Sequence, residues 1–280
     1  TLDRSSAASD VYKRQMMDRL RTWCAACGLW ALLGAGTAWA DEIVLVSPDY
    51  WCPFSCKAGA AQEGFTVDII REIFSGAGHT VRLVNENYSR ALAHVRNGRF
   101  TATPSTFREE APDFVFPRVP ISRNRYCFFV DLRSTWRYQG AASLHGRKTG
   151  VIKGYSYGPE LDRLLREQPQ DFETHTGDDL TRRLVQMVQL KRLDGFVEEE
   201  NLVQYVEKVQ PAGAVRNAGC ISSSYAYMAI SPVHPKAAEY ARLFSEGMLR
   251  LHQSGRLKAI LADYGPVSYT HLTLPTSDLV

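Results

Sequence analysis

The chain lacks an excess of charge of one sign. Its 280 residues include 33 Lys and Arg against 30 Asp and Glu, which gives a formal net charge of +3. A balance this close offers no general attraction for phosphate backbones, so we expect no nucleic acid partner. The sequence also has no low-complexity run, heptad pattern or internal repeat, which argues against coiled coils and repeat architectures.

Motifs for metal binding and catalysis are missing as well. Beyond residue 40, the histidines and cysteines show no HxxxH or CxxC spacing, so we expect no bound metal. The sequence shows no Ser-His-Asp arrangement and no nucleotide-binding motif either. It therefore predicts neither a cofactor nor a catalytic residue.

Both ends of the chain read as foreign to a folded protein. Residues 1–15 can be back-translated to a string that resembles a transposon-type sequencing adaptor. The reverse complement of that string encodes VSYTHLTLPTSDLV, which is residues 267–280. We interpret both segments as adaptor read-through, exclude them from fold prediction, and expect the natural C-terminus to be cut.

Residues 16–40 have the three-part order of a secretory signal peptide. Two arginines precede an apolar run that begins at Trp23, and AWA follows at residues 38–40. We expect cleavage after Ala40 and export to the periplasm. A transmembrane anchor is the alternative, but the apolar run is shorter than the roughly 20 residues that a span needs.

Strand-like and helix-like segments alternate after residue 40. Strands are indicated by β-branched or alternating residues, and helices by apolar residues at a spacing near 3.6. We predict a strand at 42–47, a helix at 66–77, a strand at 79–84 and a helix at 89–96. This order predicts an α/β fold with parallel strands.

The remainder of the chain repeats the same logic. We predict strands at 125–130, 149–152, 193–197 and 226–230, a helix starting near 158–159, and helices at 179–190, 235–253 and 256–264. Two α/β lobes joined by strands near 126–130 and 225–231 would enclose a cleft, the usual place for a small ligand.

Five motifs and a closing segment occur in the order found in a known family. They read PF followed by GFTVDIIREIF, YSRALAHVRNGR, REEAPDFVFP, GVIKGYSYG and RLDGFVEE, with LHQSGRLKAILADYG at the end. From about Glu42 to Gly265 the chain thus resembles the extracellular solute-binding proteins of family 3, periplasmic proteins that bind polar amino acids for ABC transporters. The resemblance implies the two-lobed type II periplasmic-binding fold, with one lobe at 41–129 and 226–266 and the other at 130–225.

The resemblance also implies ligand contacts in the first lobe. Trp51 and Tyr88 fall on the aromatic pair that sandwiches the ligand in the family, and such rings attract an ammonium group. The alternative is that both are core aromatics. Arg108 falls on the arginine that grips the ligand carboxylate through two hydrogen bonds. It could instead be exposed and paired with Glu109 or Asp113.

Further candidates come from the second lobe and from the first helix after Tyr88. The backbone N–H groups around Tyr155 and Ser156 could receive a carboxylate at a helix N-terminus, unless this is a plain helix cap. Glu199 falls where the family keeps an Asp for the ligand's amino group, with the glutamates at 198 and 200 as substitutes. A solvated acidic turn is the alternative. Arg90 is a ligand candidate or a plain surface residue.

Four cysteines remain beyond residue 40. An even number in an exported protein favours disulfides over free thiols. Cys52 and Cys56 share one loop and can close a small ring, although a reactive thiol pair is the alternative. Cys127 begins one of the predicted connecting strands and Cys220 precedes the other, so a second bridge is conceivable.

These observations predict a periplasmic solute-binding protein that captures a small polar amino acid or related amino-carboxylate between two lobes, for ABC-type import. We expect a monomer whose protein partner is an ABC permease or a membrane receptor. Two rival functions remain. One is a dehydratase-like enzyme on the same fold, with a cleft glutamate as general acid. The other is a soluble sensory module.

Overall fold

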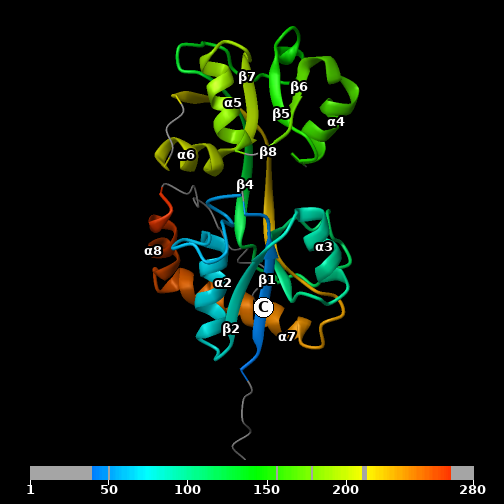
Figure 1. Ribbon diagram of the computed structural model, residues 1–280, viewed down its shortest axis with the longest axis vertical. Coiled ribbons are helices and arrows are strands. Elements are labelled where there is room, and N and C mark those ends of the chain that lie inside the picture. The colour runs from blue at the N-terminus through cyan, green and yellow to red at the C-terminus, as the bar shows by residue number, and fades with distance from the viewer. Residues whose placement is uncertain (1–39, 50, 156, 178, 210–212, 266–280) are drawn as a thin grey trace, which may run out of the picture. The chain divides into compact units, whose positions relative to one another are not determined.

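The computed structural model describes residues 40–49, 51–155, 157–177, 179–209 and 213–265 (Figure 1). All of these residues except Ala40 belong to the compact unit Asp41–Val280. The adaptor-like ends and nearly all of the expected signal peptide lie outside the described residues. Within the described ranges, no helix has the length and apolar character needed to cross a membrane.

The first lobe is built from three parallel strands and four helices. β1 pairs in parallel with β2 on one side and with β3 on the other. The element bounds are β1 (Glu42–Ser47), α2 (Phe65–Ser75), β2 (Thr80–Asn85), α3 (Tyr88–Arg96), β3 (Ala102–Thr106), α7 (Ala237–Gln253) and α8 (Arg256–Asp263).

The second lobe repeats this arrangement. β5 pairs in parallel with β6 on one side and with β7 on the other. Its elements are a 3-10 turn (Ala141–Leu144), β5 (Thr149–Ile152), α4 (Pro159–Glu167), a second 3-10 turn (Pro169–Asp171), β6 (Phe172–His175), α5 (Leu180–Gln189), β7 (Gly195–Glu199) and α6 (Glu200–Val209).

Two long strands connect the lobes (Figure 1). β4 (Ser122–Asp131) and β8 (Val215–Ile230) pair antiparallel with each other. β8 also pairs with β3 at its C-terminal end, and β4 pairs with β7. The strand order is therefore β2-β1-β3-β8-β4-β7-β5-β6. The prediction of connecting strands near 126–130 and 225–231 is confirmed, while the exact lobe boundaries stay a prediction.

Each sheet buries both of its faces, as an α/β fold requires. In the first lobe, Ile43 and Leu45 of β1 pack with α2, α7 and α8, whereas Val46 packs with α3. In the second lobe, Phe128 of β4 packs with α4, whereas Phe129 packs with α5 and α6. The alternation follows the two-residue period of a strand and confirms the predicted α/β class.

Three elements were not expected from the sequence. β3 reads ATPST, with a proline and no β-branched run, yet all five of its residues are buried. β6 is a short edge strand, and α6 begins where a solvated acidic turn was the alternative. That alternative is wrong, because Glu198 and Glu199 are 0% exposed and Glu200 is 8% exposed.

Candidate functional site

The pocket lies where both lobes reverse their strand order. The order β2-β1-β3 places successive connections of β1 on opposite sides, and β6-β5-β7 does the same for β5. Ligands of open α/β sheets bind beyond the carboxyl ends of strands at such switch points. The chain after β1 supplies Pro48 and Trp51 to one cavity, and the chain after β5 supplies Lys153 and Tyr155 to the same cavity.

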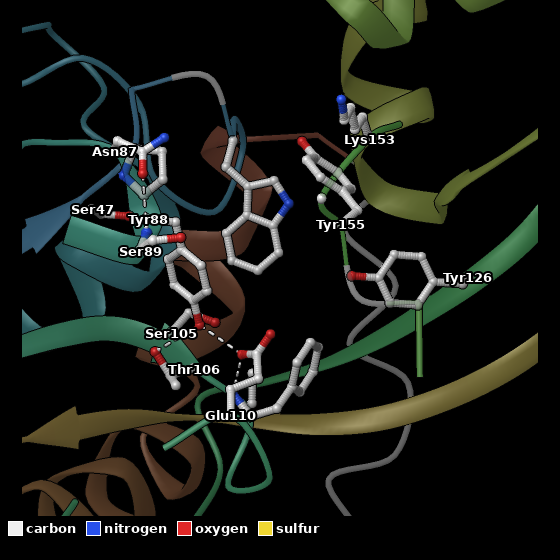
Figure 2. Close-up of a pocket in the computed structure, with 15 residues that line it drawn as sticks. Ser47, Asn87, Tyr88, Ser89, Ser105, Thr106, Glu110, Tyr126, Lys153 and Tyr155 are labelled. Carbon is white, nitrogen blue, oxygen red and sulfur yellow. Dashed lines mark hydrogen bonds between the residues drawn. The ribbon is translucent and has the colours of Figure 1, made fainter. Parts of the chain in front are cut away.

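The cavity has a volume of about 310 Å³, enough for a small ligand. Figure 2 shows the labelled side chains of the first lobe on one side and Tyr126, Lys153 and Tyr155 on the other. The described lining residues are Ser47, Pro48, Trp51, Asn87, Tyr88, Ser89, Ser105, Thr106, Phe107, Glu110, Tyr126, Lys153, Gly154, Tyr155 and Ala226.

Trp51 is held by the loop between β1 and α2. Its ring stacks on Phe54, with centroids 4.6 Å apart and planes 19° apart. The backbone N–H groups of Phe54 and Ser55 both donate to Trp51 O, at 2.9 and 3.0 Å. The loop closes against Gly64, which has φ 112°, and a Cβ there would lie 2.2 Å from Phe54 O. Glycine is required at this position, and the indole reaches the pocket from a fixed platform.

Tyr88 is the first residue of α3 and is tied to a carboxylate. Its hydroxyl donates to Glu110 Oε2 at 2.6 Å and lies 3.3 Å from Thr106 Oγ1. Glu110 Oε2 also accepts from the Phe107 N–H at 3.2 Å. Burial raises the pKa of the Glu110 carboxyl, while these two donors act against the shift. Burial and the nearby Glu110 raise the pKa of Tyr88 well above its usual range.

The second lobe contributes a turn after β5. Lys153 and Gly154 are exposed and Tyr155 is half-buried. The Tyr155 N–H donates to Ile152 O at 3.4 Å. Predicted partner Ser156 lies outside the described residues.

The start of α4 is capped from within the helix. The Tyr157 N–H donates to the Asp162 carboxylate at 2.9 Å, and Pro159 provides no N–H at the first helical position. A carboxylate of the protein itself therefore occupies part of the anion site that the sequence suggested for a ligand. Binding of a ligand carboxylate by the N–H groups around Tyr155 and Ser156 stays a prediction.

The predicted arginines do not line the cavity as described. Arg108 is exposed, lies 4.3 Å from the centroid of the Tyr227 ring and donates to Pro117 O at 2.9 Å. Asp113, one suggested partner of Arg108, pairs instead with Arg96 at 2.7 Å. Arg90 lies on α3 and is exposed.

Glu199 also lies outside the described lining, although it is fully buried at the end of β7. Its Oε2 accepts from the Leu202 N–H at 3.0 Å, which caps α6. Its Oε1 accepts from Asn201 Nδ2 at 2.9 Å and from the Arg125 N–H at 3.3 Å. Burial raises the pKa of Glu199 to about 8 and that of Glu198 to about 7.

Both disulfides conceived from the sequence are present. Cys52–Cys56 closes the loop that carries Trp51, with Cα atoms 4.9 Å apart. Cys127–Cys220 joins β4 to β8, where the two residues are partners in the strand register. A reactive thiol pair at Cys52 and Cys56 is therefore not what the structure shows.

Several lining residues were not anticipated. Glu110 and Ser105 could not be placed because β3, which brings them to the pocket, was not predicted. Lys153 carried a usable signal, since it follows a predicted strand directly and precedes a glycine. Tyr126 was read only as part of a connecting strand. Within the described part of the chain, no group of three or more His, Cys, Asp and Glu could hold a metal ion.

No protein-family model and no curated protein matches the chain. Solved structures do match. The substrate-binding protein AbpA of an amino acid ABC transporter from Streptococcus pneumoniae, bound to L-arginine, is 17% identical, with a TM-score of 0.62 over 83% of this chain and 97% of that one.

Two further solved structures match, a sensor domain and an ancestral amino acid-binding protein. A histidine kinase sensor domain with similarity to periplasmic binding proteins is 19% identical, with a TM-score of 0.63 over 81% of this chain and 96% of that one. The ancestral amino acid-binding protein AncCDT-1, a precursor of cyclohexadienyl dehydratase, is 15% identical, with a TM-score of 0.60 over 80% and 94%. At these identities the likeness shows the fold alone, and the chain has the two-lobed type II periplasmic-binding fold.

Proposed function

We propose that the protein is an exported solute-binding protein that captures a small amino acid or related amino-carboxylate between its two lobes. The pocket carries this proposal. It lies at the switch points of both lobes and has a carboxylate, Glu110, from the first lobe and an ammonium group, Lys153, from the second. These opposite charges suit the two ends of an amino acid.

Binding would use residues from both lobes. Trp51 and Tyr88 cover the apolar part of the ligand, Glu110 accepts from its amino group, and Lys153 faces its carboxylate. A ligand that touches both lobes favours the closed state, with bending in β4 and β8. The roles predicted for Arg90, Arg108, Ser156 and Glu199 have no support from the described geometry and stay predictions.

Membership of solute-binding protein family 3, export to the periplasm and delivery to an ABC permease complete the proposal. The amino acid-binding protein among the structural neighbours supports this reading. The sensor domain supports delivery to a membrane receptor as the second candidate. The precursor of a dehydratase keeps a catalytic role open, and a prephenate-like substrate that is converted to product would identify it.

Calorimetry of the full chain tests the ligand class. The protein is unfolded in guanidinium to remove carried ligand, refolded, and titrated with the standard amino acids. We expect heat with at least one amino acid, which should be recovered chemically unchanged. Trp51→Ala should remove most of this binding, whereas Leu132→Ala, at a side chain that is 55% exposed, should leave it intact. No heat with any amino acid or small peptide contradicts the proposal.

A further inference from the structure

The two charged residues of the pocket, Glu110 and Lys153, differ in how firmly the protein positions them. Glu110 is fixed on the first-lobe side, because Tyr88 Oη and the Phe107 N–H both donate to it. Both donors reach the same oxygen, Oε2. Figure 2 shows these two hydrogen bonds and the second carboxylate oxygen, to which no bond is drawn. Glu110 thus has a positioned acceptor, Oε1, to offer a ligand.

A second acceptor lies in the same lining. Ser105 is 5% exposed, and its Oγ has no hydrogen-bond partner among the described residues. Burying a hydroxyl without a hydrogen-bond partner costs free energy, so a ligand that bonds to Ser105 Oγ removes this cost and gains affinity. A primary ammonium group has three N–H donors, and Glu110 Oε1 together with Ser105 Oγ can accept two of them.

Aromatic rings form much of the remaining surface. Five contribute to the lining: Trp51, Tyr88, Phe107, Tyr126 and Tyr155. Ring faces carry negative partial charge and attract a desolvated cation. The rings and Glu110 therefore act in the same sense, in favour of a positive ligand group.

Among the lining residues that the structure describes, no comparable group of side chains receives an anion. Among the described lining residues the one basic side chain is Lys153, which is exposed. Arg108 is engaged with Tyr227 and Pro117, and Arg125 pairs with Glu200 at 2.6 Å. The start of α4 already binds Asp162. An exposed lysine is a single point charge and lacks the two-pronged geometry with which arginine holds a carboxylate.

We infer that the pocket recognises a primary ammonium group on a compact hydrocarbon body, and that the ligand carboxylate is dispensable. This inference rests on the proposed function and shifts its ligand class from amino-carboxylates to small primary amines, which include amino acids and their decarboxylated counterparts. The cationic end lies against Glu110, Ser105 and the rings, and the other end points toward the exposed Lys153.

Matched ligand trios test the inference on the ligand-stripped full chain. Each trio contains an amino acid, the amine without its carboxylate, and the acid without its amino group. We use phenylalanine, 2-phenylethylamine and 3-phenylpropionate, and leucine, isopentylamine and 4-methylpentanoate. Calorimetry gives the dissociation constant of each.

In a trio that binds, we expect the dissociation constant of the amine to lie within about tenfold of that of the amino acid. The acid should bind about 100-fold more weakly than the amino acid, or weaker still. Loss of the amine with the amino acid retained overturns the inference but leaves the proposed solute-binding function standing. Absence of binding by every amino acid, amine and acid overturns both.

Variants locate the effect. Glu110→Gln should lower the affinity for the amine by about 30-fold or more. Ser105→Ala is a milder change that serves if Glu110→Gln fails to fold, and it should lower this affinity by about threefold to tenfold. Lys153→Ala should leave the affinity for the amine unchanged within about twofold and lower that for the amino acid by a few-fold. A larger effect of Lys153→Ala than of Ser105→Ala on the amine contradicts the assignment.

Discussion

Glu110 and Glu199 are two carboxyls with raised pKa values and different tasks, and the first is half-buried whereas the second is fully buried. Glu199 uses both oxygens on the protein, since it accepts from Leu202, Asn201 and Arg125. Glu110 receives both of its hydrogen bonds on one oxygen and lines the cavity. The acceptor oxygen left over on Glu110, and not a raised pKa, separates a carboxyl that can bind a ligand from one that caps a helix.

The largest expected effect comes from removing the carboxyl with the free oxygen. Glu110→Ala should lower affinity for the amine or amino acid by about 100-fold, or about 3 kcal/mol, because a ligand ammonium loses its charged partner. Calorimetry measures this. The thermal midpoint should fall less than in Glu199→Ala, because two donors lose an acceptor and Tyr88 Oη still lies 3.3 Å from Thr106 Oγ1. A variant that unfolds early while binding normally would reverse the comparison.

Removing the capping carboxyl should have the opposite signature. Glu199→Ala removes the acceptor that Leu202, Asn201 and Arg125 share and should lower the free energy of unfolding by roughly 2 kcal/mol. Affinity should stay within about threefold of the parent. Urea denaturation checks stability, and Glu42→Ala on the exposed surface, where Glu42 pairs only with Arg82, is the matched control.

The second-lobe carboxyls should also make stability depend on pH. The folded-state pKa values of Glu198 and Glu199, about 7 and about 8, lie above their ordinary value of 4.5. The folded protein therefore binds more protons than the unfolded chain between about pH 4.5 and pH 8, and stability falls as pH rises through this window. Urea denaturation should show a loss of at least about 1 kcal/mol from pH 5.5 to pH 8. Glu199→Ala should reduce this loss, and an unchanged loss would point to other groups.

Ligand affinity should follow the reverse trend with pH. Burial raises the pKa of Glu110, and Glu109 and Asp162 add to the shift while Tyr88 and the Phe107 N–H oppose it. Only the ionised carboxylate attracts an ammonium ion, so affinity for the amine should rise a few-fold from acidic to neutral pH, with proton release. Titrations in buffers of different ionisation enthalpy measure the release. Affinity that falls with rising pH excludes Glu110 as the ammonium partner.

The smallest effect is expected at Arg108. The side chain lies over Tyr227 and away from the described lining, so Arg108→Ala should change affinity by less than about threefold and stability by about 0.5–1 kcal/mol. A loss of affinity near that of Glu110→Ala would identify Arg108 as the residue that binds the ligand carboxylate. The pocket would then position an anion-binding residue as well as the cation-binding Glu110.

Strands with a β-branched sequence of their own were predictable, and β3, which lacks one, was not. β1 and β5 match their predicted ranges, because β-branched runs ended by proline or glycine carry their own signal. β3 carries no such signal. Its small and polar residues are buried because the strand lies between β1 and β8, and both of these strands are distant from β3 in the sequence.

The site was predictable to the same extent. Trp51, Tyr88 and Tyr155, which the family resemblance and the turn before a helix suggested, lie in the lining of the cavity, while their roles in ligand binding stay predictions. Arg108 and Glu199 follow strands as well, but the direction of a side chain depends on contacts that spacing does not encode. Arg108 turns to an aromatic ring of β8, and Glu199 turns to the backbone of α6.

The Cys127–Cys220 disulfide makes a closed covalent ring of the chain that carries β5, β6, β7 and α4 to α6. A protease that cuts once inside this ring leaves a molecule of full mass on a gel until a reductant is added. A cut outside the ring releases a fragment at once. One cut in the backbone of the second lobe therefore does not separate this lobe from the rest of the protein while the disulfide is intact.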